Sequence, residues 1–261
     1  MGNGPAHIAH RLANHEGVFR DTISIEERAF ELGTTFSILR AVSDTVRGAV
    51  AEHRLPILLA GGCLTSLGSL SAIGTEATAL VWLDAHGDFN TPETTPSGFI
   101  DGMAIAAITG RCWRTLTASV PGFAALPEEN VVLIGSRDLD AEECAALENS
   151  RITRLSSQSL RKHGIENALR EVLTNLPERA YVHLDLDVLD RSEARANEYS
   201  CPGGLTATEL LEIIRFIGHN RAIVGASITA YDPSVDQDSK ALDAAVAAVK
   251  AVLAGACIAV S

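Results

Sequence analysis

The sequence predicts an α/β protein, a three-layer α/β/α sandwich built around a mainly parallel sheet. Short apolar runs of strand length alternate along the chain with segments of helical periodicity, as in parallel sheets covered by helices on both faces. Two of the apolar runs lead directly into clusters of acidic residues, and open parallel sheets bind their ligands at the carboxyl ends of the strands. No stretch has the composition of an interdomain linker, so we expect residues 1–261 to form a single domain.

The individual elements follow from hydrophobic spacing and from the residues that interrupt it. Ile25 to Arg54 carries apolar residues at helical spacing and predicts one long helix, which Pro56 ends before a short strand, Ile57 to Ala60. Residues 91–102 are rich in Thr, Pro, Ser and Gly and predict a loop that covers a site. The same criteria predict buried strands at 80–83, 131–135, 181–184 and 222–229, helices at 65–72, from about 103, at 206–217 and at 241–253, and an irregular segment at 191–204.

Composition limits the possible partners and the cellular compartment. The formal net charge is −12, which argues against nucleic acid and anionic membranes as partners and favours a cationic or metal-bound small molecule. The five cysteines form no CxxC pair, as expected of a reduced cytoplasmic protein. The start of the chain does not resemble a secretory leader, and no apolar run reaches membrane-spanning length.

Potential metal ligands follow two of the predicted strands. Asp84, His86 and Asp88 alternate after the apolar run 80–83, and Asp185 and Asp187 alternate after 181–184. Alternate side chains of an extended chain point the same way, so the five groups can converge at one edge of the sheet. Four carboxylates and an imidazole describe a site for more than one divalent cation. The plainer alternative is that these residues cap the elements that follow.

Four segments in this order resemble the ureohydrolases, the family of arginase, agmatinase and formimidoylglutamase. Residues 84–90, DAHGDFN, are similar to the family signature DAHxDxN, and residues 183–190, HLDLDVLD, are similar to SxDxDxxDP. Residues 91–98 resemble the substrate loop of arginase, and residues 134–140 resemble its GxRDxD segment. The resemblance implies an arginase-like fold. Ureohydrolases normally open with a strand, which does not precede Met1 here; we expect either that this edge strand is lost or that Met1 is internal to a longer reading frame.

The resemblance also implies a ligand set for two metal ions. Cys63 stands where the family motif GGDH has its histidine, as in the subgroup that includes Nω-hydroxy-L-arginine amidinohydrolase. One ion would be held by Cys63, Asp84, Asp88 and Asp185, and the other by Asp84, His86, Asp185 and Asp187. These donors suit Mn²⁺, while a thiolate makes Fe²⁺, Co²⁺ or Zn²⁺ suitable at the Cys63 side. Alternatively, Cys63 is an ordinary buried residue. We expect His183 on the opposite face from the aspartates, packed or behind the ligands.

Further positions correspond to substrate contacts in the family. Asn90 and Ser97 match contacts to the substrate carboxylate, and Asp140 and Glu143 match contacts around its α-ammonium, which implies an amino-acid-like substrate. The alternatives are turn stabilisation for the first two and solvated charges at a helix start for the other two. Arg137 and Asp138 are interpreted as a structural pair.

The catalytic step predicted from this site is attack by a water that two cations have made acidic, with Asp88 orienting the resulting hydroxide. Asp101 replaces the loop histidine that carries protons in arginase, and it could do so only if burial raised its pKa. Ala230 stands where the family has the glutamate that binds the guanidinium, and Asp232 or Asp236 is the alternative group for that role. We therefore expect a hydrolase of linear amidines or guanidines acting on Nω-hydroxyarginine or a related compound rather than arginine. The alternatives are a formimino or amide hydrolase and a catalytically idle metal-binding relative. The family resemblance implies a homo-oligomer, a trimer or a hexamer.

Overall fold

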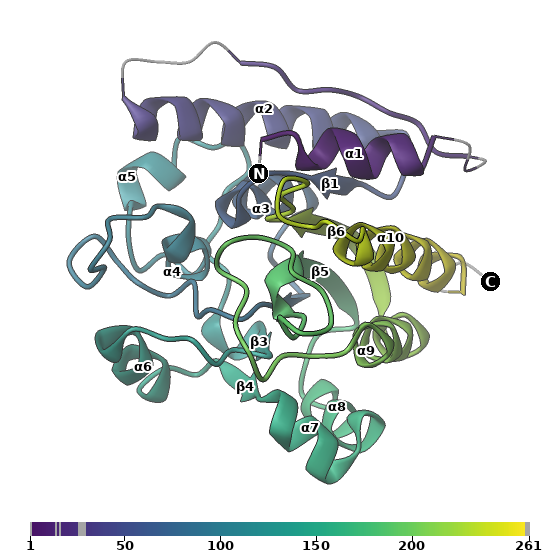
Figure 1. The fold of residues 1–261 in the computed structure, drawn as a ribbon. Helices are drawn as coiled ribbons and strands as arrows, with labels where there is room; N and C mark the ends of the chain where they lie inside the picture. Colours follow the sequence, from purple (N-terminus) through teal and green to yellow (C-terminus); the bar gives the residue numbers. More distant parts are fainter. Residues whose placement is uncertain (1, 14, 16, 26–29, 259–261) are drawn as a thin grey trace.

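The computed structural model describes residues 2–13, 15, 17–25 and 30–258. A single sheet runs through the centre of the molecule with helices around it (Figure 1). The strands, in chain order, are β1 (Ile57–Leu59), β2 (Thr78–Leu83), β3 (Val131–Ile134), β4 (Thr153–Leu155), β5 (Arg179–Asp185) and β6 (Ala222–Thr229). They lie in the order β1-β6-β5-β2-β3-β4, and every neighbouring pair is parallel.

The helices form two layers on the two faces of this sheet. They are α1 (Gly4–Arg11), α2 (Glu31–Ala51), α3 (Ser66–Ile73), α4 (Ala104–Ile108), α5 (Arg114–Thr117), α6 (Ala141–Glu148), α7 (Ser157–His163), α8 (Ile165–Leu173), α9 (Ala207–Asn220) and α10 (Lys240–Ile258). Side chains of α1 and α7 to α10 pack with Val81 and Leu83 of β2 in one core. Side chains of α2 to α6 pack with Leu80 and Trp82 in the other core. The predicted three-layer α/β/α sandwich is therefore confirmed.

The central strands agree with the prediction because their apolar runs are buried on both faces. All six residues of β2 and all four of β3 are buried, and β6 has the predicted bounds. Within the described residues the first strand is β1, which lies at one edge of the sheet. None of the described helices is long and apolar enough to cross a membrane.

Several elements differ from their predicted bounds. The long helix begins at Glu31 rather than at Ile25, which lies outside any helix, and part of the predicted helix, residues 26–29, lies outside the described residues. The first helix, α1, starts at Gly4 with Pro5 in its first turn, where proline is well tolerated because no helical N–H is lost.

Candidate metal centre

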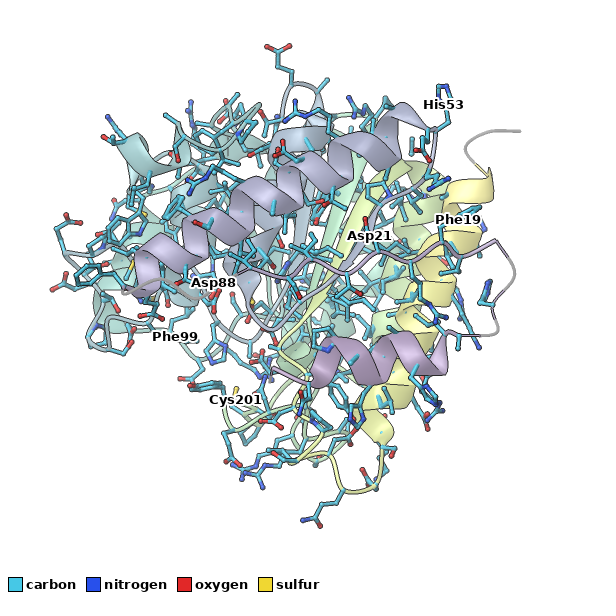
Figure 2. The ribbon with its side chains drawn as sticks, turned by 90° about the horizontal axis from the view of Figure 1, so that it is seen from above. Phe19, Asp21, His53, Asp88, Phe99 and Cys201 are labelled. Atoms are coloured by element: carbon cyan, nitrogen blue, oxygen red, sulfur yellow. The ribbon has the colours of Figure 1, made fainter. Side chains whose placement is uncertain are left out.

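The predicted site residues gather at the carboxyl edge of the sheet around a cavity of about 560 Å³. Two of the lining residues, Asp88 and Phe99, are labelled in Figure 2, at the opposite side of that view from Phe19. The cavity is lined by all of the predicted metal, catalytic and substrate-binding residues: Cys63, Asp84, His86, Asp88, Asn90, Ser97, Asp101, Asp140, Glu143, Asp185 and Asp187. Residues from segments far apart in the sequence therefore share one cavity.

Asp84 and His86 hold each other in place at the end of β2. Asp84 Oδ2 accepts a hydrogen bond from Trp82 Nε1 at 3.1 Å, and Asp84 Oδ1 accepts one from the backbone N–H of His86 at 2.7 Å. The Nδ1 atom of His86 lies 3.3 Å from Asp84 Oδ1 and 3.5 Å from Asp187 Oδ2. Burial disfavours a charge on this imidazole, but the hydrogen bond to Asp84 and the charges of both aspartates raise its pKa to about 9. A cation bound by His86 would displace a proton near neutral pH.

Cys63 and the two aspartates of β5 complete the opposite side of the centre. Cys63 starts a 3₁₀ turn shortly after β1, and its Sγ donates to Asp185 Oδ2 at 3.0 Å. Asp185 Oδ1 accepts from the N–H of Asp187 at 2.9 Å, and Asp187 Oδ1 accepts from the N–H of Ala85 at 3.3 Å. Burial, together with the charges of neighbouring aspartates, raises the pKa of the Cys63 thiol and of Asp185. These are groups that a nearby cation would stabilise in their ionised forms.

Asp88 has a buried carboxylate oxygen, Oδ2, with no hydrogen-bond partner in the described part of the chain. Its backbone has a positive φ of 49°, and its carbonyl oxygen accepts from the N–H of Ile105 at 2.8 Å. Burial, followed by the charges of Asp84 and Asp185, raises the pKa of Asp88. An unpaired buried carboxylate is costly, so this oxygen is suited to a ligand that brings positive charge.

The donor set therefore fits a pair of divalent cations. Among the described residues, two groups have ligand atoms within 4.8 Å of one another: Asp84, His86 and Asp187 form one, and Cys63, Asp84 and His183 form the other. Asp84 belongs to both groups, as a bridging carboxylate would. The first group offers oxygen and imidazole donors, whereas the second adds a thiol.

The position of His183 corrects the prediction made from the sequence. We expected this side chain on the face opposite the aspartates, but it lies on their face and reaches the Cys63 group. The reason is the strand repeat itself, because His183 and Asp185 are two residues apart and so point the same way. His183 is completely buried and stacks on Trp82 of β2, with 3.4 Å between the ring centroids.

Asp101 and Glu143 are held beside the centre by backbone amides. Asp101 Oδ1 accepts from the N–H of Leu64 at 3.0 Å, and its carboxylate lies against Gly62, where any side chain would collide with it. Burial raises the pKa of Asp101, as its predicted role requires. Glu143 is buried, accepts from the N–H of Phe89 at 2.9 Å and also has a pKa raised by burial.

Asn90, Asp140 and Ser97 lie at the outer part of the cavity. Asn90 Nδ2 donates to Asp140 Oδ2 at 2.9 Å, which links the two predicted substrate contacts directly. Asn90 Oδ1 accepts from Thr94 Oγ1 at 3.0 Å, and Ser97 Oγ accepts from the N–H of Phe99 at 3.2 Å. Asn90 and Ser97 therefore also have local loop bonds, as the alternative interpretation for these two residues anticipated.

Sequence reasoning missed two residues in the segment 191–204, Asn197 and Tyr199. The buried Asn197 donates through Nδ2 to Asp187 Oδ2 at 3.3 Å and to the carbonyl of Ala230 at 2.9 Å. Tyr199 stacks on Phe99 with ring centroids 5.8 Å apart, and its edge faces His86. Both residues line the cavity. The segment has no hydrophobic period or motif that would have identified them.

The fold and the site define a class of protein: an α/β/α sandwich whose strand ends assemble a carboxylate-rich cluster of candidate metal ligands. The chain belongs to the Arginase family, whose model matches residues 4–255. Members of this family are hydrolases of C–N bonds in amidines and guanidines, and this chain is an arginase-family hydrolase. The predicted resemblance to ureohydrolases is thus confirmed.

Individual relatives agree with this assignment. The arginase of Bacillus caldovelox is 33% identical over 204 residues, which cover 76% of this chain and 68% of that protein. The crystal structure of arginase from Bacillus cereus is similar with a TM-score of 0.86 at 26% identity, covering 96% of this chain and 91% of that one. The formimidoylglutamase of Bacillus subtilis shares the fold, with a TM-score of 0.78 at 20% identity, 97% coverage of this chain and 80% of that one.

Proposed function

We propose that the protein uses two divalent metal ions to hydrolyse a C–N bond in a linear amidine or guanidine carried by an amino-acid-like substrate. The observation that carries the proposal is the convergence of thiol, imidazole and carboxylate donors from the ends of β2 and β5 and from the turn after β1 in one cavity. Cys63, Asp84, Asp88 and Asp185 would hold one ion, and Asp84, His86, Asp185 and Asp187 would hold the other. Mn²⁺ suits most of these donors, and Fe²⁺, Co²⁺ or Zn²⁺ suits the Cys63 side.

The chemistry of the proposed site divides between the ions and the protein. When bound, two divalent cations would lower the pKa of a water molecule in the cavity and so supply a nucleophile near neutral pH. Asp88 would accept a proton from that water and orient it, and its buried, unpaired Oδ2 supports this role. Asp101, whose pKa burial raises, would keep a proton to a higher pH than an ordinary aspartate and deliver it to the leaving amine.

The outer part of the cavity would hold the amino-acid end of the substrate. Asn90 and Ser97 would bind its carboxylate, and Asp140 and Glu143 would contact its α-ammonium directly or through water. The Asn90–Asp140 hydrogen bond supports this division, because it turns an amide and an acidic group toward the same region of the cavity.

The inner part of the cavity favours a weakly basic head group over arginine. At the position of the family glutamate the chain has the buried Ala230, and the neighbouring polar group is the neutral amide of Asn197. A full guanidinium charge would have no dedicated carboxylate there, whereas an N-hydroxyguanidine is less basic. We therefore propose Nω-hydroxyarginine or a related compound as the substrate. Because Ala230 provides no carboxylate for a guanidinium, a formimino or amide substrate is the second candidate.

The proposal is tested with Mn²⁺-loaded protein and a panel of Nω-hydroxyarginine, arginine, agmatine and formimino and amide compounds. We expect release of hydroxyurea from Nω-hydroxyarginine at a higher kcat/KM than release of urea from arginine. Turnover of formimino or amide substrates alone would select the second candidate. Stoichiometric binding of two ions without turnover of any compound would instead indicate an idle metal-binding relative.

We also propose that residues 1–261 act as one domain in a homo-oligomer, a trimer or a hexamer, in the cytoplasm. The four cysteines whose side chains are described are all free, as expected of a reducing compartment. The proposed oligomer is implied by the family resemblance alone. Light scattering coupled to gel filtration would measure the assembly, and a monomeric mass at micromolar concentration would refute this part of the proposal.

A further inference from the structure

The imidazole of His183 is completely buried, and its Nε2 atom lies toward the Cys63 side of the centre. His183 and Trp82 are paired across β5 and β2, and their rings stack at 3.4 Å with an interplanar angle of 14°. The indole also donates to Asp84 Oδ2. Trp82 therefore contacts both Asp84 and His183 and helps to orient these two side chains toward the Cys63 side of the centre.

The Nδ1 atom of His183 is held by two serine hydroxyls. Ser66 Oγ on α3 and Ser227 Oγ on β6 both lie 2.8 Å from Nδ1, and they are 2.8 Å from each other. Two hydroxyl oxygens at this distance can accept from an Nδ1–H, and in that tautomer the lone pair is on Nε2. Metal-binding histidines are commonly oriented in this way, with the second ring nitrogen donating to a fixed acceptor.

The lone pair on Nε2 has only a weak partner in the described structure. Its nearest hydrogen-bonding group is Thr229 Oγ1 at 3.4 Å. That hydroxyl is also 3.3 Å from the carbonyl oxygen of Leu184 and 3.4 Å from Cys63 Sγ. A threonine has one hydroxyl proton, so a hydroxyl that donates to the Leu184 carbonyl has no proton left for the lone pair of Nε2. Nε2 remains available to a Lewis acid.

We propose that His183 binds the metal ion on the Cys63 side through Nε2, as a ligand additional to those implied by the family resemblance. Its ligand atom, Cys63 Sγ and an Asp84 oxygen all lie within 4.8 Å of one another. Neighbouring donors around one ion, with bonds of about 2.0–2.3 Å, are separated by about 3.0–3.5 Å. Side-chain movements of about 1 Å would therefore close the group around a cation. This inference rests on the dinuclear centre of the proposed function.

An imidazole donor added to the thiolate and the carboxylates changes which ion this position prefers. A thiolate and an imidazole on the same ion favour Zn²⁺, Co²⁺ or Fe²⁺ over Mn²⁺, whereas the His86 side remains mainly oxygen-coordinated. The two positions would then differ in metal preference. A mixed centre, with a thiophilic ion beside Cys63 and Mn²⁺ beside His86, would form when both metals are supplied.

X-ray absorption on the whole wild-type protein loaded with Zn²⁺ at both positions tests the inference directly. The scattering pattern of imidazole counts histidine ligands, and His86 is the histidine already assigned. We expect two imidazoles and one sulfur shared between two ions. One imidazole between two ions would overturn the inference and make His183 a packed core residue.

A pair of variants gives an independent reading. The substitution His183→Asn keeps an amide near the two serines and removes the atom at Nε2, so one imidazole should disappear and Zn²⁺ affinity at the Cys63 side should fall about tenfold or more. The control Thr229→Val removes the nearby hydroxyl without removing the proposed ligand, and it should keep both imidazoles. Equal Zn²⁺ affinities for His183→Asn and the wild type would contradict the assignment.

The inference and the proposed function fail in different ways. Two ions with one imidazole and normal turnover would refute the role of His183 and leave the hydrolase intact. Two ions with two imidazoles but no turnover of any amidine or amide would support His183 as a ligand and refute the proposed function. Failure to bind metal at all would refute both.

Discussion

At the scale of single residues, Cys63 introduces a thiol into a centre otherwise built from oxygen and imidazole donors, and its Sγ lies 3.0 Å from Asp185 Oδ2. We expect Cys63→Ala to retain about one ion per chain where the wild type binds about two, because a methyl group cannot replace a thiolate ligand. Elemental analysis after gel filtration measures this. The matched control is Cys112→Ala, another buried free thiol, which should keep both ions. Retention of both ions at unchanged affinity in Cys63→Ala would show that Cys63 is not a ligand.

Ala230 is the residue at which we expect the head-group preference of the cavity to be set. It lines the cavity and is only 6% exposed. Ala230→Glu should raise kcat/KM for arginine relative to Nω-hydroxyarginine by about 10- to 100-fold, because a charge-assisted hydrogen bond to guanidinium contributes about 1.5–3 kcal/mol. Competition assays on the two substrates measure the ratio. The uncharged Ala230→Gln controls for size and should give a smaller change; an equal effect of both substitutions would rule out a missing charge as the cause.

The candidate site was largely predictable because strand alternation is a local rule. Asp84, His86 and Asp88 follow one buried run, and the parallel order places the end of β5 beside them. His183 obeys the same rule, and our error was in applying it. Asn197 was not predictable, because its contact to Asp187 depends on how an irregular segment folds back over the strand ends.

At the scale of elements, the guanidinium of Arg137 ties that irregular segment to the site. We interpreted Arg137 as paired with Asp138, but its hydrogen bonds go to backbone carbonyls at 2.9–3.3 Å. The acceptors are on three segments: Gly135 after β3, Asp187, Val188 and Leu189 after β5, and Cys201 and Pro202. The planar fork of arginine thereby positions the backbone of a proposed ligand, Asp187.

We expect Arg137→Lys to lower the unfolding free energy by about 2 kcal/mol. A lysine ammonium cannot donate to all of the carbonyl oxygens that surround the planar guanidinium, so some of them lose their hydrogen bond. In a chain of this size that corresponds to roughly 4–8 °C in Tm, measured by calorimetry of the metal-loaded protein. Arg179→Lys is the control, because its guanidinium donates to a single carbonyl, that of Ile73. A loss no greater than that of the control would show that the carbonyl bonds of Arg137 contribute little.

The elements that were predicted differ physically from those that were missed. Central strands such as β2 and β3 consist almost entirely of apolar residues and are fully buried. Their composition is therefore enough to predict that they are buried strands. The edge strand β4 has three residues, none of them fully buried, with Arg154 exposed. Such a strand forms because it pairs with β3. This pairing depends on the tertiary fold and cannot be predicted from hydrophobic periodicity.

At the scale of the whole molecule, the acidic centre couples metal binding to stability. The chain already carries a formal net charge of −12, and four of its aspartates, Asp84, Asp88, Asp185 and Asp187, are buried together. Burial and then the charge of Asp84 raise the pKa of Asp187 to about 6. The folded pKa of Asp187 is above its unfolded value near 4, so ionisation of this group opposes folding. The contribution of protonated Asp187 to the free energy of unfolding is therefore fully present below about pH 4 and is lost as the pH rises through 6.

Removal of the metal by a chelator should therefore destabilise the protein more at pH 7.5 than at pH 5.5. At pH 7.5 the loss of bound cations leaves ionised, buried carboxylates without compensation, and we expect Tm to fall by roughly 10 °C, the scale of tight ion binding. At pH 5.5 part of the charge is neutralised by protons, so the metal-free protein should melt higher than at pH 7.5. Asp187→Asn should reduce this pH dependence in the metal-free protein. Scanning calorimetry with and without chelator measures all four conditions, and equal losses at both pH values would mean that these carboxylates are not the groups that the metal ions stabilise.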